Sequence, residues 1–401
     1  MSIVRRMRED DVEAAATVGV AAFGGDVAPR VQRLREGPRF TWRDGWVVET
    51  DGGEIGATAT AFPVTFWLGG TSYTASAIGG VAVRATERRR GLASAMMRAL
   101  LEADLQAGRS FSMLYPFQHG FYRRLGYATT GFTHYYRIPI AHLPDVPALR
   151  RNVRFVREEE RDIISELYRR ALSELGGLER SDAQWEQRWR TTTQTWVVYD
   201  DGAINGYLTY DRDNKELRIT DVVARTPAAE RGLWSFVAAQ IEQCQWATYH
   251  APTNKPLWAT LREPLMFDAA NRGFILEDAA ALTASLQIRI VDPQAAFARR
   301  SFDGALSGSV TLALHDPVLA ANNGTWMITF AGGRAQAQRT DAEGQVHCDV
   351  VTLAQLFCGV LRATDARWYD LLQTDDDAAV ALLDQAFANG ATPFIQPADY
   401  F

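Results

Sequence analysis

Residues 78–127 read IGGVAVRATERRRGLASAMMRALLEADLQAGRSFSMLYPFQHGFYRRLGY, and this stretch decides the fold. An apolar strand ends at Val81-Ala82-Val83, and a polar, arginine-rich turn follows over 84–90. From about Gly91 onward, apolar residues recur at helical spacing, which predicts a helix. The stretch therefore predicts a strand that enters a helix through a charged turn.

The turn before this helix has the properties of an anion site. The first N–H groups of a helix have no partner within the helix, and its positive end attracts negative charge. Gly91 allows the backbone to approach a ligand closely, and Ala93 keeps the first turn narrow. We therefore expect a pyrophosphate-sized anion to bind the segment Arg88-Arg89-Arg90-Gly91-Leu92-Ala93-Ser94.

An internal repeat organises the first two thirds of the chain. Residues 46–60, WVVETDGGEIGATAT, match residues 196–210, WVVYDDGAINGYLTY, and each copy predicts a hairpin with an Asp-Gly turn. Residues 81–97 likewise match residues 222–238 at an offset of 141, and we expect a strand, a turn and a helix in both copies. Two matches in the same order predict two copies of one α/β domain.

The second copy differs in its turn, which reads Ala229-Glu230-Arg231-Gly232-Leu233-Trp234. Glu230 adds a negative charge that would repel an anion, and Trp234 replaces the small Ala93 and would fill the phosphate space. We expect this copy to keep the fold and to have lost the ligand.

The remaining C-terminal stretch has a different pattern. β-Branched content and alternation predict strands at 283–291, 306–314, 325–330 and 346–351, and helices at 352–361 and 377–388. The acidic run Asp375-Asp376-Asp377 precedes the last helix, and capping explains it better than metal binding does. We expect an α/β (α+β) chain with domains at 1–145, 146–285 and 286–401.

Composition excludes several classes of protein. The 401 residues carry a formal net charge of −6, which argues against a nucleic-acid-binding face. Three cysteines form no disulfide framework, and the six histidines show no metal-ligand spacing, so we expect no metal. Neither a signal peptide nor a run of about 18 apolar residues is present, which predicts a cytoplasmic protein without a membrane partner.

The sequence resembles the GNAT N-acetyltransferases in two motifs. Arg88–Ala93 matches the signature R/Q-x-x-G-x-G/A, and FYRRLGY at 121–127 resembles F-Y-x-x-x-G-[FY]. The resemblance implies that acetyl-CoA is the co-substrate and that the loop holds its pyrophosphate. It also implies that Val81, Ala82 and Val83 pair with the pantetheine, and that Phe117 and Gln118 touch the thioester end.

The order of the three domains resembles the Eis (enhanced intracellular survival) acetyltransferases. By this resemblance, the domains are an active GNAT domain, a degenerate GNAT-like domain and a domain similar to sterol carrier proteins. Members of that family acetylate amines, including aminoglycosides, and form hexamers, so the resemblance implies a homo-oligomer.

Acetyl transfer needs a general acid and a general base. By the same resemblance, Tyr122 is the general acid; Tyr127 is the competing candidate, although its position suggests a core residue. His119 lies nearby and is an alternative base. The first domain contains no cysteine, which excludes a cysteine acyl-enzyme there.

The last residues of the sequence, Asp399-Tyr400-Phe401, are rich in aromatic side chains. In Eis proteins a terminal carboxylate acts as the base, so the resemblance assigns this role to Phe401. The alternative is a terminal ring that docks only for stability. Asp399, two residues earlier, could add negative charge near this carboxylate but need not take part in the reaction.

The sequence constrains the acceptor of the acetyl group less than it constrains the co-substrate. A negative net charge favours a cationic amine, and Asp26 is a candidate anchor for it or else an ordinary turn residue. An aminoglycoside, a polyamine and a lysine side chain satisfy the same electrostatics. Two other hypotheses stay open: a lipid or sterol carrier acting through the C-terminal domain, and a scaffold with a vestigial acetyl-CoA site.

Overall fold

The computed structural model describes residues 2–263, 278–388 and 392–401. The chain forms two compact units. The first unit comprises Met1–Thr130, Ser285–Ala391 and Phe401, and the second comprises Gly131–Ala284 and Thr392–Tyr400. The fold class is mixed α/β, as predicted. No described helix is long and apolar enough to span a bilayer.

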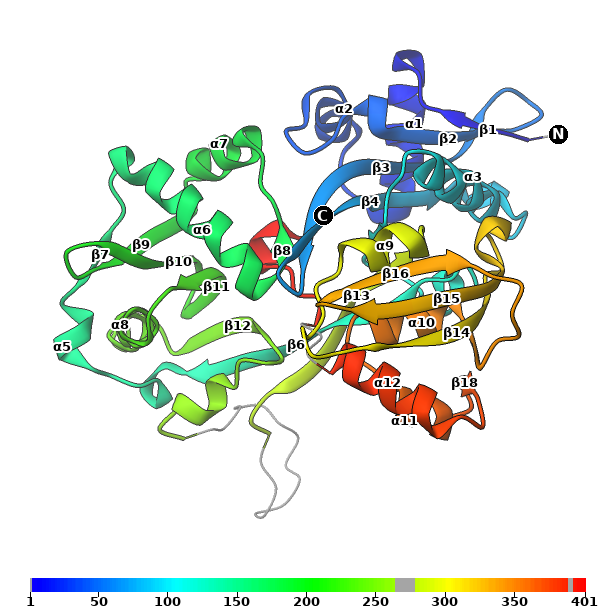
Figure 1. Ribbon diagram of the computed structural model, residues 1–401. Helices are drawn as coiled ribbons and strands as arrows, with labels where there is room; N and C mark the ends of the chain where they lie inside the picture. The colour runs from blue at the N-terminus through cyan, green and yellow to red at the C-terminus, as the bar shows by residue number, and fades with distance from the viewer. Residues whose placement is uncertain (1, 264–277, 389–391) are drawn as a thin grey trace. The chain divides into compact units, whose positions relative to one another are not determined.

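The sheet of the first unit has the strand order β1-β2-β3-β4-β5-β13 (Figure 1). Its strands are β1 (Ile3–Arg6), β2 (Gly45–Glu49), β3 (Ile55–Leu68), β4 (Thr71–Val83), β5 (Phe111–Leu114) and β13 (Ala281–Ile290). β4 and β5 run parallel, and the other pairs are antiparallel. The predicted hairpin of the first repeat is confirmed as β2 and β3.

Helices cover both faces of this sheet because successive apolar side chains of its strands point to opposite faces. The helices are α1 (Val12–Phe23), α2 (Val27–Glu36), α3 (Leu92–Gln106) and the short α4 (His119–Arg123). Val47 packs in one core with α1 and α2, whereas its neighbours Trp46 and Val48 pack in another with α3. The predicted helix after the charged turn is confirmed as α3.

The C-terminal stretch adds a second sheet to the first unit, with the order β16-β15-β14-β17-β18. Its elements are α9 (Pro293–Arg299), β14 (Gly308–His315), β15 (Gly324–Ala331), β16 (Arg334–Arg339), β17 (Val346–Asp349), α10 (Val350–Phe357), α11 (Ala363–Trp368), β18 (Leu372–Gln373) and α12 (Asp377–Phe387). The predicted strands and helices are confirmed within a few residues. Asp376 caps α12 by accepting a bond from the Ala379 N–H, as expected of the acidic run.

A buried ion pair joins the two parts of the first unit. Arg289 and Asp316 are fully buried, and two bonds of 2.7 Å connect them. Arg289 also donates to the Leu125 carbonyl at 2.7 Å. Since Leu125 belongs to the first repeat and Asp316 to the C-terminal stretch, the guanidinium connects both.

The second unit repeats the α/β pattern of the first. Its strands are, in spatial order, β6 (Ala128–Pro139), β12 (Trp246–Pro252), β11 (Glu216–Ala224), β10 (Ile204–Asp213), β9 (Gln194–Asp200) and β7 (Val153–Phe155). Its other elements are α5 (Pro147–Arg150), α6 (Arg161–Leu175), β8 (Gly177–Leu178), α7 (Asp182–Arg190) and α8 (Pro227–Ala238). The second predicted hairpin is confirmed as β9 and β10.

Candidate active site

The candidate site begins where two parallel strands separate. The ladder between β4 and β5 joins Ala75–Ile78 with Phe111–Leu114, and β4 continues to Val83 beyond the last pair. Val81 and Val83 are half-buried, whereas Ala82 between them points into the core with α1. This end of β4 therefore offers backbone groups to a ligand on the side that β5 has left.

The turn after β4 adopts the conformation of an anion-binding loop. Arg89 and Gly91 both have positive φ, 62° and 81°. Gly91 is the N-cap of α3, and no side chain caps the helix. The first backbone bond of α3 runs from the Ala95 N–H to the Gly91 carbonyl, so the preceding N–H groups are available to a ligand.

Arg88, Arg89 and Arg90 are exposed. Arg90 forms an ion pair with Glu87 at 2.5 Å, while Arg88 and Arg89 are solvated. A Cβ atom at Gly91 would meet nothing within 4 Å, so the space in front of the loop is open. Exposed arginines and a free helix end beside an open space suit a pyrophosphate.

Tyr122 lies in α4 and is buried, with 2% of its surface exposed. Its ring packs edge-on against Phe121 at 4.9 Å and against Phe117 at 5.6 Å between centroids. Burial raises the pKa of Tyr122 above its usual value, so the hydroxyl keeps its proton at neutral pH. Phe117 is exposed, and Gln118 is the N-cap of α4, so both lie beside Tyr122.

The two alternative residues have other partners. Tyr127 is fully buried in the core, and its hydroxyl lies 2.8 Å from the Ser112 hydroxyl. The position agrees with the expectation of a core residue. His119 is exposed, and its Nδ1 lies 3.1 Å from the Thr129 hydroxyl.

Phe401 lines a cavity of about 240 Å³ in the first unit. Its ring is 5.8 Å from Phe62 and 5.0 Å from Tyr115, measured between ring centroids. Besides Phe401 and Phe62, the residues that line this cavity are Phe23, Arg30, Arg33, Leu34, Phe40, Thr60, Gly79 and Gly80.

Sequence reasoning missed most of this cavity. The sequence signal that could have indicated it is the Gly79-Gly80 pair directly before Val81. Gly80 has a φ of 61°, and a Cβ atom added there would come 3.2 Å from Arg30, so this position requires glycine. Asp26 is exposed as the N-cap of α2 and is not among the described residues that line the cavity. Burial lowers the pKa of Arg30, and repulsion from Arg33 adds to the effect.

The second repeat lacks the loop because its helix begins earlier. α8 starts at Pro227 with Thr226 as its N-cap, six residues before Leu233, the counterpart of Leu92. The turn predicted over 229–234 is therefore wrong for this copy, and the N–H of Glu230 bonds within the helix to the Thr226 carbonyl. The residues that correspond to the open start of α3 therefore lie inside α8 in this copy.

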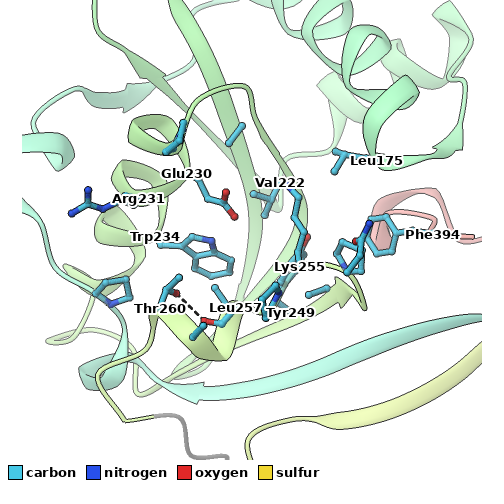
Figure 2. A pocket seen from close by; sticks show the side chains of 18 of the residues that line it. Leu175, Val222, Glu230, Arg231, Trp234, Tyr249, Lys255, Leu257, Thr260 and Phe394 are labelled. Atoms are coloured by element: carbon cyan, nitrogen blue, oxygen red, sulfur yellow. Dashed lines mark hydrogen bonds between the residues drawn. The ribbon is translucent and has the colours of Figure 1, made fainter. Parts of the chain in front are cut away.

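Trp234 lines a cavity rather than filling it. The cavity of about 460 Å³ lies in the second unit, and Val222, Trp234, Tyr249, Leu257 and Phe394 contribute its apolar walls. Figure 2 shows the Trp234 indole facing this space, the Glu230 carboxylate above it and the Arg231 guanidinium directed away. Arg231 and Lys255 are the described cations that line this cavity, and neither stands at the start of α8, so the arginine-rich turn of the first repeat has no counterpart among these residues.

Metal ligands are not gathered in the part of the chain that the structure describes: no group of three or more His, Cys, Asp or Glu residues there could hold an ion. Cys244, Cys348 and Cys358 are buried and free, and burial raises the pKa of each.

Sequence models of known families match three consecutive parts of the chain. Two models described as "Acetyltransferase (GNAT) domain" match residues 3–130 and 176–288. One described as "Sterol carrier protein domain" matches residues 293–396.

The chain is similar over nearly its whole length to annotated and solved proteins. It is 24% identical to the N-acetyltransferase Eis of Mycobacterium tuberculosis over 410 aligned positions, covering 95% of each chain. It is 25% identical to an uncharacterized N-acetyltransferase of Streptomyces griseus, with 82% of each covered. Two crystal structures show the same fold over all of both chains: a GCN5-related N-acetyltransferase from Anabaena variabilis (TM-score 0.86, 21% identity) and Eis1 from Mycobacterium abscessus (0.78, 20%).

Models of two GNAT domains and of a sterol carrier protein domain match the chain in this order, and the Eis similarity extends over all three. The chain is an Eis-like N-acetyltransferase of the GNAT family, and this family uses acetyl-CoA.

Proposed function

We propose that the first GNAT domain transfers the acetyl group of acetyl-CoA to a primary amine, with Tyr122 as general acid and the Phe401 carboxylate as general base. The observation that carries this proposal is the position of Phe401. Its ring lines the cavity of the first unit, next to Gly79 and Gly80 and therefore beside the end of β4.

The loop and the end of β4 hold the co-substrate in this proposal. Arg88, Arg89 and Arg90 and the first N–H groups of α3, from Gly91 to Ser94, bind the pyrophosphate. Val81, Ala82 and Val83 offer backbone groups to the pantetheine, and Phe117 and Gln118 flank the thioester. Acetyl-CoA supplies the activated acyl group and a thiolate as leaving group.

The Phe401 carboxylate prepares the nucleophile. A terminal carboxyl has a reference pKa near ~3.5, so it is ionised at neutral pH and attracts an ammonium. It takes a proton from the amine, whose nitrogen then attacks the acetyl carbonyl while a C–N bond forms. The ring contacts with Phe62 and Tyr115 hold the carboxylate in place.

Tyr122 completes the reaction as the C–S bond breaks. The apolar surroundings that raise its pKa keep the hydroxyl protonated, and a protonated hydroxyl can donate to the leaving sulfur. Tyr127 is less suited because its hydroxyl is already engaged with Ser112.

The acceptor is a cationic amine of the aminoglycoside or polyamine type in this proposal, favoured by the net charge of −6. Asp26 is the candidate anchor at the exposed start of α2.

The cavity that Phe401 lines favours a second class of acceptor. Its described lining holds four phenylalanines, which suit an aromatic or alkyl body on the amine, whereas its two arginines and the lack of an acidic side chain disfavour an acceptor with many positive charges.

One assay tests the proposal and separates the acceptor classes. Release of free coenzyme A thiol is followed with acetyl-CoA and one of three acceptors: an aminoglycoside, a polyamine such as spermidine, or an arylalkylamine such as phenethylamine. Turnover with any of them supports the proposal. A protein that binds acetyl-CoA and turns over none of them at millimolar concentration would contradict it.

The family resemblance also supports a hexameric, cytoplasmic enzyme that needs neither nucleic acid nor membrane. Light scattering after gel filtration tests the hexamer.

The hypothesis of a lipid or sterol carrier has less support. A cavity of about 400 Å³ in the C-terminal domain is lined by Ala313, Leu314 and Leu371 but also by His315, His347, Asp349 and Asp370, and these polar groups do not suit a sterol.

A further inference from the structure

The second GNAT domain contains a cleft that corresponds to the co-substrate cleft of the first. β11 and β12 pair in parallel over Glu216–Arg218 and Trp246–Thr248. β11 then continues to Ala224 without β12 while it stays paired with β10, as β4 continues beyond β5 while paired with β3. Val222 is the counterpart of Val81 in the repeat, and both are half-buried next to a buried residue. The cleft has persisted although the phosphate loop has not.

Part of the C-terminal segment, Thr392–Tyr400, occupies this cleft. The Gln396 side-chain amide donates a 3.0 Å hydrogen bond to the Val222 carbonyl. This is the strand position where the first domain is expected to accept a pantetheine amide. Phe394 and Gln396 both line the 460 Å³ cavity, and Figure 2 shows Phe394 on the far side of it from Trp234. The protein's own chain thus takes the place of the pantetheine.

A buried charged cluster fixes the far end of the segment. Asp399 is 3% exposed, and Arg180 donates two bonds of 2.7 Å to its carboxylate. The Tyr168 hydroxyl adds a third bond at 2.9 Å. Arg180 is also paired with the fully buried Asp221 at 2.7 Å. Burial alone would raise the pKa of Asp399, but Arg180 and Arg188 outweigh it, so the carboxyl stays ionised.

Such a cluster restricts the chain more than an ordinary tail contact does. Tails are usually solvated, yet Phe394, Ile395, Gln396 and Asp399 are each no more than 3% exposed. A buried ionic group contributes little net stability, and its best-attested use is to impose one geometry. Phe401 follows Asp399 by two residues, so the cluster limits where its carboxylate can be.

We infer that the second GNAT domain has become the binding site for the chain's own C-terminal segment, and that Asp399 acts there as a positioning residue for Phe401. The part that concerns Phe401 rests on the proposed function. The binding of the segment does not, and the two are tested separately.

The test measures how firmly the segment is held. Carboxypeptidase A removes aromatic residues from accessible C-termini, and intact-mass spectrometry of the 401-residue protein follows the release of Phe401. Asp399→Asn keeps the size of the side chain and removes its charge. We expect Phe401 to be released at least tenfold faster from D399N than from the parent protein. Gln396→Met, which removes only the donor to Val222, should give a smaller increase.

The control loses an equally buried ion pair elsewhere. Asp316→Asn removes the partner of Arg289 in the first unit, so it lowers the melting temperature without touching the segment. We expect parent-like release of Phe401 from D316N. Release of Phe401 from both D399N and Q396M at the parent rate would overturn the inference. It would also be overturned if release from D316N were accelerated as much as release from D399N and Q396M.

Steady-state kinetics distinguish the two proposals. A positioning role predicts that kcat of D399N falls at least tenfold while KM for acetyl-CoA stays within about twofold, with partial recovery in Asp399→Glu. If release accelerates and kcat does not change, the segment is bound as inferred and the base role of Phe401 is wrong.

Discussion

The ring of Phe401 lies 5.0 Å from the ring of Tyr115, the residue that directly follows β5. A terminal ring placed there puts an α-carboxylate beside the strands that form the candidate site. This relationship leads to the first prediction, which concerns the carboxylate alone.

Adding Gly-Ser-Gly-Ser after Phe401 should lower kcat at least 10²-fold, the range for loss of a general base. The extension moves the carboxylate and leaves the ring free to bind Tyr115 and Phe62. Affinity for acetyl-CoA and the melting temperature should stay close to those of the parent. The same residues added before Met1 provide the control, and a fully active extended protein would show that Phe401 only docks.

Replacing Gly91 by valine should abolish acetyl-CoA binding in a thermal-shift titration. The residue has a φ of 81°, which a β-branched side chain adopts only with strain, and its side chain would enter the space of the phosphate. Gly108→Val is a matched control, because Gly108 has a φ of 68° and equally open surroundings at the other end of α3. Loss of binding in both variants would point to strain rather than to the phosphate.

Tyr122→Phe should reduce kcat about 10²-fold or more and leave cofactor affinity unchanged, because only the proton donor is lost. The matched variant Tyr127→Phe removes the 2.8 Å bond to Ser112 and should lower stability by about 1 kcal/mol without lowering kcat. Rapid-quench measurement of product formation compares the two. The reverse outcome would transfer the acid role to Tyr127.

Calorimetric titration should give one acetyl-CoA per chain, bound in the first domain. The second domain has lost the loop N–H groups to α8, and its cleft is lined with apolar side chains and the C-terminal segment. A stoichiometry of two would contradict this account of the second repeat.

Glu160 should make the stability of the protein depend on acid pH. Bonds from Arg154 lower its pKa from 4.5 to about 2. A carboxyl with a depressed pKa stabilises the fold above its unfolded value, and the contribution disappears as the pH falls from about 4.5 to 2. Glu160→Gln should cost roughly 2 kcal/mol in urea unfolding at pH 7 and almost nothing near pH 2. The exposed neighbour Glu159→Gln should show neither effect.

Local patterns were sufficient to predict the strand, the charged turn and α3, because spacing and composition determine them within 20 residues. They also predicted both hairpins. The cavity around Phe401 could not be predicted, since Phe23, Phe62 and Phe401 are brought together only by the tertiary fold. The same holds for Asp399, whose partners Tyr168 and Arg180 lie more than 200 positions away.

The early start of α8 has a consequence for the history of the duplicated domain. Replacing Ala229 by arginine and Trp234 by alanine would restore the phosphate signature in the sequence but not the site. The N–H groups from Glu230 onward would still be bonded inside a helix that Thr226 and Pro227 initiate. Recovering a second catalytic centre would require the helix to be unwound by more than a turn, so point substitutions alone cannot reverse the divergence of the two copies.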